Sequence, residues 1–133
     1  MRTGIRALFV VAQLAMAAAP ALAHHSLFAV FDEDQSITLK GVVSKVEWVN
    51  PHVYLYLDVD DGTGKVNTWS IETFPPTTLR RAGLTRDKLG YGETITLLGY
   101  KARNGSQLAF LRQITFADGR ELLISLGDIK TVR

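Results

Sequence analysis

Residues 53–59 alternate strictly between apolar and polar positions. The odd-numbered positions from Val53 to Val59 are apolar, and the even-numbered positions from His52 to Asp58 are polar or aromatic. A period of two is typical of a strand with one buried face. The preceding Asn50-Pro51 favours a break, because proline lacks an N–H for the strand ladder and disfavours helix at the residue before it. We therefore predict a corner, then a strand whose polar side begins at His52.

Five other segments have the composition or periodicity of strands. In the first of them, the apolar phase slips near Gly41, which indicates a bulge or sharp bend. Asn104-Gly105 lies between two alternating runs and is a strong hairpin signal. A short helix is predicted where proline opens and Gly83 closes the run 76–83. The strand segments are residues 37–49, 66–73, 94–101, 107–116 and 121–129.

The order is three strands, a short helix, two strands and an additional C-terminal strand. Five strands with a helix between the third and fourth is the order of the OB-fold. We predict an all-β domain with one short helix, forming a small OB-like five- to six-stranded Greek-key barrel over residues 37–133. A different six-stranded barrel or roll is the alternative. Residues 24–36, which are rich in aromatic and acidic side chains, are expected to form an N-terminal arm.

The first 23 residues have the pattern of a secretory signal peptide. Arg2 and Arg6 precede an apolar run over residues 7–18, and Ala21-Leu22-Ala23 resembles a cleavage site. The apolar run is shorter than the about 20 residues that span a bilayer, so a retained anchor is the weaker interpretation. We predict cleavage after Ala23, a periplasmic location and no membrane span in the mature chain.

Charge and cysteine content exclude several classes of function. The chain has 15 Lys and Arg against 13 Asp and Glu, and removing Arg2 and Arg6 leaves equal numbers. A mature chain without excess basic charge is not expected to bind nucleic acid. The absence of cysteine excludes a thiol nucleophile, a thiolate metal site and disulfides.

The three histidines are the most specific candidate for chemistry. His24 and His25 would open the mature chain, and His52 begins the second strand. A terminal amine together with imidazole and amide nitrogens suits Cu(II), and to a lesser degree Ni(II) or Zn(II). We therefore predict a site for Cu(II) or another divalent metal at His24, His25 and His52, which would lose its metal in acid. In the competing interpretation the terminal histidines are solvated and His52 only closes the corner.

The polar side of the second and third strands is a second candidate site. In OB-folds this outer surface commonly binds ligands, and aromatic rings there can stack on them. Cross-strand pairs that only stabilise the sheet are the competing interpretation. The residues that we expect to share this surface are Tyr54, Tyr56, Thr68, Ser70 and Glu72.

Catalysis and calcium binding have little support. The chain has no nucleophile-elbow motif, no His-Glu-x-x-His and no phosphate-binding glycine loop. Its acidic runs do not follow the spacing of a calcium-binding loop. We therefore expect a binding module rather than an enzyme: a metal-binding protein in the first interpretation, and an adaptor for an envelope protein or small ligand in the second.

Five runs support a resemblance to a known family of small exported proteobacterial proteins of unknown function. The most distinctive is Glu47-Trp48-Val49-Asn50-Pro51-His52, which follows Val46, and the others are His24-His25-Ser26 and residues 37–43, 79–83 and 118–120. The resemblance implies a Gram-negative envelope protein with a single small β domain, and it implies no activity. The chain departs from the family in its long tail over residues 122–133 and at Phe74-Pro75-Pro76, where a turn of smaller residues is expected.

Overall fold

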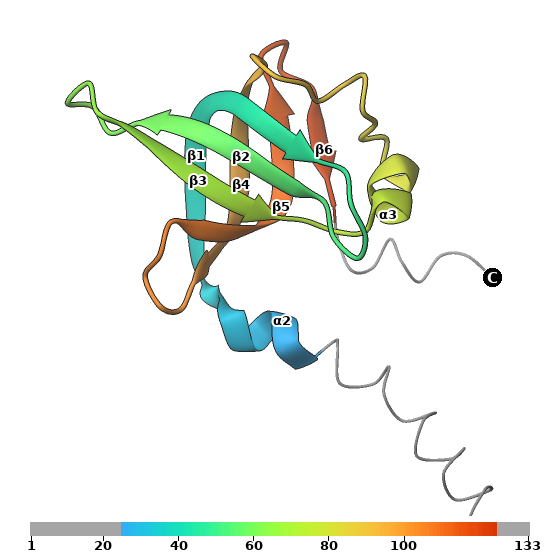
Figure 1. Ribbon diagram of the computed structural model, residues 1–133, viewed down its shortest axis with the longest axis horizontal. Coiled ribbons are helices and arrows are strands. Elements are labelled where there is room, and N and C mark those ends of the chain that lie inside the picture. Colours follow the sequence, from blue (N-terminus) through green and yellow to red (C-terminus); the bar gives the residue numbers. More distant parts are fainter. Residues whose placement is uncertain (1–24, 125–133) are drawn as a thin grey trace, which may run out of the picture. The chain divides into compact units, whose positions relative to one another are not determined.

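The computed structural model describes residues 25–124 (Figure 1). The chain divides into two compact units between Val30 and Phe31, and the barrel belongs to the second. No helix within the described range is long and apolar enough to cross a membrane. In chain order the elements are α2 (His25–Val30), β1 (Phe31–Glu47), β2 (Tyr54–Asp60), β3 (Val66–Glu72), α3 (Pro76–Arg81), β4 (Thr94–Ala102), β5 (Leu108–Phe116) and β6 (Glu121–Leu123).

Five of the strands close into a ring. The sheet order is β3-β2-β1-β4-β5-β6, and a further pairing between β3 and β5 joins its two sides. This β3–β5 pairing is parallel, whereas the others are antiparallel. Figure 1 shows the β2–β3 hairpin crossing in front of β1, β4 and β5. With α3 between β3 and β4, this is the predicted OB-like barrel, and the fold prediction is confirmed.

One edge of β5 pairs with two different strands. Its first residues, from Leu108 to Phe110, pair with β3, and its later residues, from Gln113 to Thr115, pair with β6. The ring therefore closes through only the first third of β5. β6 is shorter than the predicted strand over residues 121–129, and residues 125–133 lie outside the described range.

The interior is filled by the apolar phase of each strand. Leu55 and Leu57 from β2 are fully buried, as the alternation of residues 53–59 predicts. Leu79 anchors α3, and the N–H of Leu84 donates to the Leu79 carbonyl across Gly83, which has a positive φ. This hydrogen bond is typical of a helix end closed by a glycine. The other large side chains buried there include Val43, Ile71, Ile95, Leu97, Leu111 and Ile114.

β1 begins earlier than the sequence analysis predicted. Phe31 and Asp32 pair with Ala102 and Lys101 of β4, so the end of the expected arm over residues 24–36 is already part of the barrel. The register shifts between Asp32 and Ser36, and the side chain of Asp32 accepts hydrogen bonds from within this irregular stretch. Alternation of apolar residues could not reveal the start of a strand that is irregular and acidic over residues 32–36.

A glycine allows β1 to approach β2. A Cβ atom at Gly41 would collide with the carbonyl oxygen of Asp58 and lie 3.0 Å from Cγ of Leu57. The register between β1 and β2 then shifts between Val43 and Lys45, which places the predicted bulge at Ser44. Gly90, in contrast, has no atom within 4 Å of the corresponding position.

We expect Gly41→Ala to destabilise the barrel by about 1–3 kcal/mol, because the new methyl group must displace the β2 backbone. Gly90→Ala is the matched control and should be neutral or stabilise by up to about 1 kcal/mol. Urea unfolding followed by tryptophan fluorescence measures both variants. Equal midpoints for the two would contradict the close approach of β1 and β2 at Gly41.

Candidate ligand-binding face

The outer surface of β2 and β3 is a continuous polar face. Tyr54 lies opposite Glu72 and Tyr56 lies opposite Ser70 in the β2–β3 register, so their side chains point to the same side of the hairpin. β1 extends the surface on the other side of β2, where Glu47 pairs with Tyr54. We define the β2–β3 face as Lys45, Glu47, His52, Tyr54, Tyr56, Asp58, Thr68, Ser70 and Glu72.

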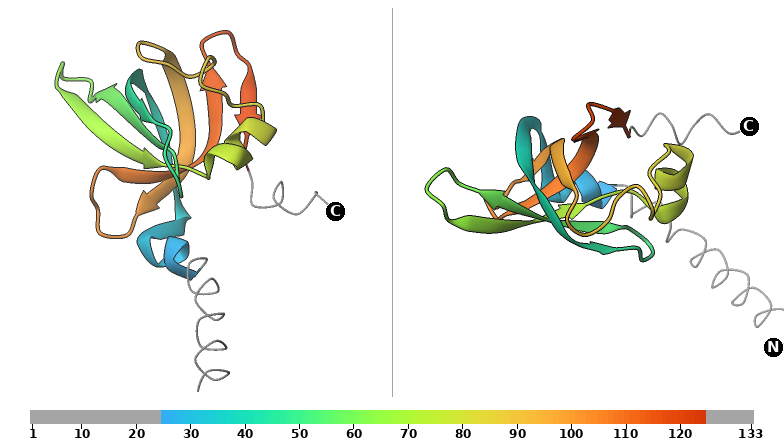
Figure 2. Two further views of the ribbon diagram at one scale, coloured as in Figure 1. Left: turned by 45° about the vertical axis from the view of Figure 1, so that its right-hand side comes forward. Right: turned by 90° about the horizontal axis from the view of Figure 1, so that it is seen from above.

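One end of the β2–β3 face lies toward the tip of the hairpin, which extends beyond the rest of the barrel. In both views of Figure 2 the tip of the β2–β3 hairpin projects beyond the other strands. The tip is a turn at residues 61–65 in which Gly62 and Gly64 have positive φ. At its other end the face meets the corner between β1 and β2.

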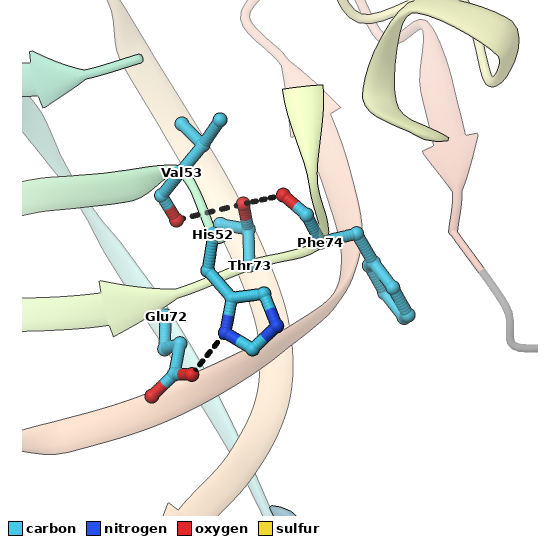
Figure 3. A network of polar contacts seen from close by, with 5 residues as sticks. All are labelled: His52, Val53, Glu72, Thr73 and Phe74. Carbon is cyan, nitrogen blue, oxygen red and sulfur yellow. Dashed lines mark hydrogen bonds and ion pairs between the residues drawn. The ribbon is translucent and has the colours of Figure 1, made fainter. Parts of the chain in front are cut away.

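His52 and Glu72 form the polar contact at this corner (Figure 3). Nδ1 of His52 lies 2.5 Å from Oε1 of Glu72, and their side chains are 31% and 18% exposed. An ionised carboxylate only accepts hydrogen bonds, so Nδ1 carries the proton and donates. Whenever the ring is neutral, Nε2 keeps a lone pair that can accept a hydrogen bond or bind a metal.

Thr73 fixes the backbone beneath this contact. Its hydroxyl is buried and donates to the Val53 carbonyl at 2.8 Å, beside the backbone hydrogen bond from the Thr73 N–H to the same oxygen (Figure 3). The N–H of Val53 donates in turn to the Phe74 carbonyl at 3.2 Å. These bonds extend the β2–β3 pairing past the strand ends and hold His52 opposite Glu72.

The corner itself contains a cis peptide bond between Asn50 and Pro51. Arg86, in the loop after α3, contacts Trp48 at the start of this corner. Its guanidinium lies 5.5 Å from the centre of the Trp48 ring. Nη2 of Arg86 also contacts the Trp48 carbonyl at 3.4 Å. Trp48 thus packs at the rim of the barrel, where Arg86 covers its ring.

The carboxylate of Glu47 is held between two neighbours. Nζ of Lys45 lies 2.5 Å from Oε1, and the Tyr56 hydroxyl donates to Oε2 at 3.1 Å. The Lys45 ammonium also lies 5.3 Å from the centre of the Tyr56 ring. Tyr56 is therefore fixed on two sides.

Asp58 is held by hydroxyl groups instead. Oγ1 of Thr68 donates to Oδ1 at 2.7 Å, and Oγ of Ser44 lies 3.1 Å from the same oxygen. Ser44 reaches Asp58 because it is the bulged residue of β1. Oδ2 accepts no hydrogen bond from residues 25–124.

Both tyrosines have a raised pKa. For Tyr54 the main cause is burial, and the charges of Glu72 and then Tyr56 add to it. For Tyr56 burial again comes first, followed by the hydrogen bond to Glu47 and the charge of that carboxylate. Glu47 itself has a lowered pKa because of its contacts with Lys45 and Tyr56. Both phenols therefore stay protonated, as hydrogen-bond donors, at neutral pH.

The loop between β4 and β5 lies beside β3. The N–H of Ser70 donates to the Gln107 carbonyl at 3.0 Å, directly before the β3–β5 pairing begins. In OB-folds the loops that follow the first and fourth strands border the ligand surface. Here these loops are the corner that carries His52 and the turn at residues 103–107.

The predicted site residues fall into two groups. The ligand-face candidates Tyr54, Tyr56, Thr68, Ser70 and Glu72 do share one surface, as their register requires. His52 joins them through Glu72. His24 lies outside the described residues, and the side chain of His25 in α2 is also not described. Within the described part of the chain, no group of three or more histidines and carboxylates could hold a metal ion.

The sequence analysis missed the contribution of β1. Lys45 and Glu47 stand beside Tyr56 and Tyr54, and both contact the Tyr56 side chain. The predicted phase slip after Gly41 was the available signal, because it moves odd-numbered residues to the outer side. Asp58 was assigned to the polar side, but its bonds to Ser44 and Thr68 depend on tertiary structure.

A closed five-stranded barrel with this helix position and this outer face defines the chain as an OB-fold protein. A solved structure agrees with that class. The yeast (S. cerevisiae) mitochondrial single-stranded DNA binding protein Rim1 is similar with a TM-score of 0.50 at 9% identity, over 62% of this chain and 93% of that one. TiaS, in a complex with a tRNA and ATP, has a TM-score of 0.46 at 19% identity, over 65% of this chain and 19% of that one. At such identities the likeness concerns the fold alone.

The chain belongs to a family of unknown function, DUF6152, whose model matches residues 11–110. The matched range contains the whole β2–β3 face. No curated protein sequence matches this chain significantly.

We expect Glu72→Gln to lower the pKa of Tyr54, because the substitution removes a neighbouring negative charge. The pKa should remain above the ordinary value of about 10, since burial persists. Glu47→Gln is the matched control and should lower the pKa of Tyr56 instead. Ring-carbon NMR of labelled tyrosine, followed through an alkaline titration, resolves the two phenols. An unchanged Tyr54 pKa in Glu72→Gln would contradict the arrangement across β2 and β3.

Proposed function

We propose that this protein is an exported periplasmic binding module whose ligand docks on the β2–β3 face. The observation that carries the proposal is the pair of half-buried tyrosines, Tyr54 and Tyr56, surrounded by polar groups that neighbouring side chains already hold in place. A surface whose groups are ordered before binding loses little conformational entropy when a ligand arrives. The OB-fold commonly uses this surface for ligands.

Export is part of the same proposal. It is supported by the leader-like pattern of residues 1–23 and by the resemblance of His24-His25-Ser26 and the Glu47–His52 run to small exported proteobacterial proteins. An envelope protein or a small molecule of the envelope is then the expected ligand.

The test uses the protein isolated from the periplasm with labelled backbone amides. Added envelope fractions, separated by size, should perturb amide signals on the β2–β3 face. The double variant Tyr54→Ala, Tyr56→Ala should need at least about ten times more of the active fraction for the same perturbation, because truncating central aromatic residues weakens binding. Tyr91→Ala is the matched control, because Tyr91 is 87% exposed and lies in the loop before β4, off this face.

Perturbations confined to residues outside the β2–β3 face would contradict this proposal. The same is true of a double variant that folds and still responds like the native protein.

A second candidate is binding of Cu(II), or another divalent metal, by the processed terminus at His24 and His25 together with His52. The His52–Glu72 contact favours it, because metal-binding histidines usually donate their other ring N–H to a carboxylate. The amine and amide nitrogens of a chain that begins at His24 would complete a nitrogen donor set suited to Cu(II).

Copper titration of the periplasmic protein, monitored by visible absorption and by competition with a chelator, tests this candidate. The double variant His24→Ala, His25→Ala should abolish tight binding, and Glu72→Gln should weaken it by about 10–100-fold. Glu47→Gln is the control, since that carboxylate holds Lys45 and Tyr56 and has no contact with His52. Binding no tighter than to an unrelated protein, or a first residue other than His24 in mass spectrometry, would overturn the metal site.

A further inference from the structure

The β2–β3 face has the wrong charge for a polyanionic ligand. It carries three carboxylates, on Glu47, Asp58 and Glu72, against the single ammonium of Lys45. Phosphate backbones are bound by clustered Lys and Arg, whose neutralising charge supplies most of the affinity. The likeness to a single-stranded DNA binding protein therefore does not extend to the chemistry of this face. Its ligand should be neutral or positively charged.

The three carboxylates are fixed hydrogen-bond acceptors. Each one is oriented by donors of the face itself: Lys45 and Tyr56 for Glu47, hydroxyls for Asp58, and His52 for Glu72. A carboxylate has about four lone-pair sites, so each keeps unused acceptor capacity. Among the described residues, Oδ2 of Asp58 and Oε2 of Glu72 accept no hydrogen bond. These oxygens are suited to a ligand that offers hydroxyl donors.

The two tyrosines add an apolar surface beside these acceptors. Tyr54 and Tyr56 follow each other on the same side of β2, about 7 Å apart along the strand. Lys45 covers one side of the Tyr56 ring, whereas the Tyr54 hydroxyl makes no hydrogen bond to any residue in the range 25–124. Tyrosine combines a flat apolar body with a polar end. A ligand with an apolar ring face and a rim of hydroxyls matches both features.

Sugar rings have this combination of surfaces, because their axial C–H groups form an apolar patch and their hydroxyls project around it. We propose that the β2–β3 face binds neutral oligosaccharides, with one sugar ring stacked on Tyr54 and donating to Glu72, and with the hydroxyls of a later ring donating to Asp58, about 14 Å further along β2. This inference rests on the proposed function and names its ligand class. A cationic peptide is less favoured, because each carboxylate already has a partner in place.

The experiment titrates the periplasmic protein, with labelled amides, with the tetramer of N-acetylglucosamine and with cellotetraose. At least one should shift the amides of β2 and β3, and raising the salt tenfold should change the Kd by less than about twofold, because a neutral ligand is not screened. Tyr54→Ala should raise the Kd about tenfold, which corresponds to about 1.4 kcal/mol, while Tyr91→Ala leaves it unchanged. Glu72→Gln should weaken binding less than Tyr54→Ala, because the amide oxygen still accepts.

Two further probes separate the alternatives. A nonalysine peptide that shifts the face, with an effect lost at high salt, while neither sugar binds, would overturn the oligosaccharide and leave the proposed binding face intact. Binding of single-stranded oligothymidine there would overturn the charge argument. If neither sugar shifts any amide of β2 or β3, the oligosaccharide inference is wrong, whereas the proposed function is decided separately by the experiment with envelope fractions.

Discussion

β1 pairs with two different strands, with β4 along its first part and with β2 along its second, and Val42 pairs with both. A strand can change partners in this way only if it bends, and β1 bends between Gly41 and Lys45. Gly41 lets the Asp58 backbone approach, and the bulge at Ser44 increases the local twist. This bend converts a meander of strands into a barrel that β3 and β5 can close.

The same bend assembles the outer surface. After the bulge, Lys45 and Glu47 point to the same side of the sheet as Tyr54 and Tyr56. The bulged Ser44 itself reaches Asp58. Three strands thus contribute to one face. Its carboxylates are held by partners from four places: β1, β2, β3 and the corner that contains His52.

The charge of this face differs from that expected of a surface that binds nucleic acid. The barrel is similar to that of a single-stranded DNA binding protein, yet the corresponding surface here has an excess of carboxylates. A fold offers a position for a site, while the charge and hydrogen-bonding groups at that position select the ligand. Membership in a family of unknown function adds no activity, so the choice among ligands depends on these side chains alone.

Local patterns in the sequence determined which segments are strands and which side of β2 is buried. Alternation at residues 53–59 and the turn glycines are local signals, because side-chain direction in a strand depends only on position along it. Only the tertiary structure decided that β1 begins at Phe31, that Lys45 and Glu47 belong to the face, and that His52 donates to Glu72. Those features depend on register between strands far apart in the chain. That register follows from barrel closure, which no single segment encodes.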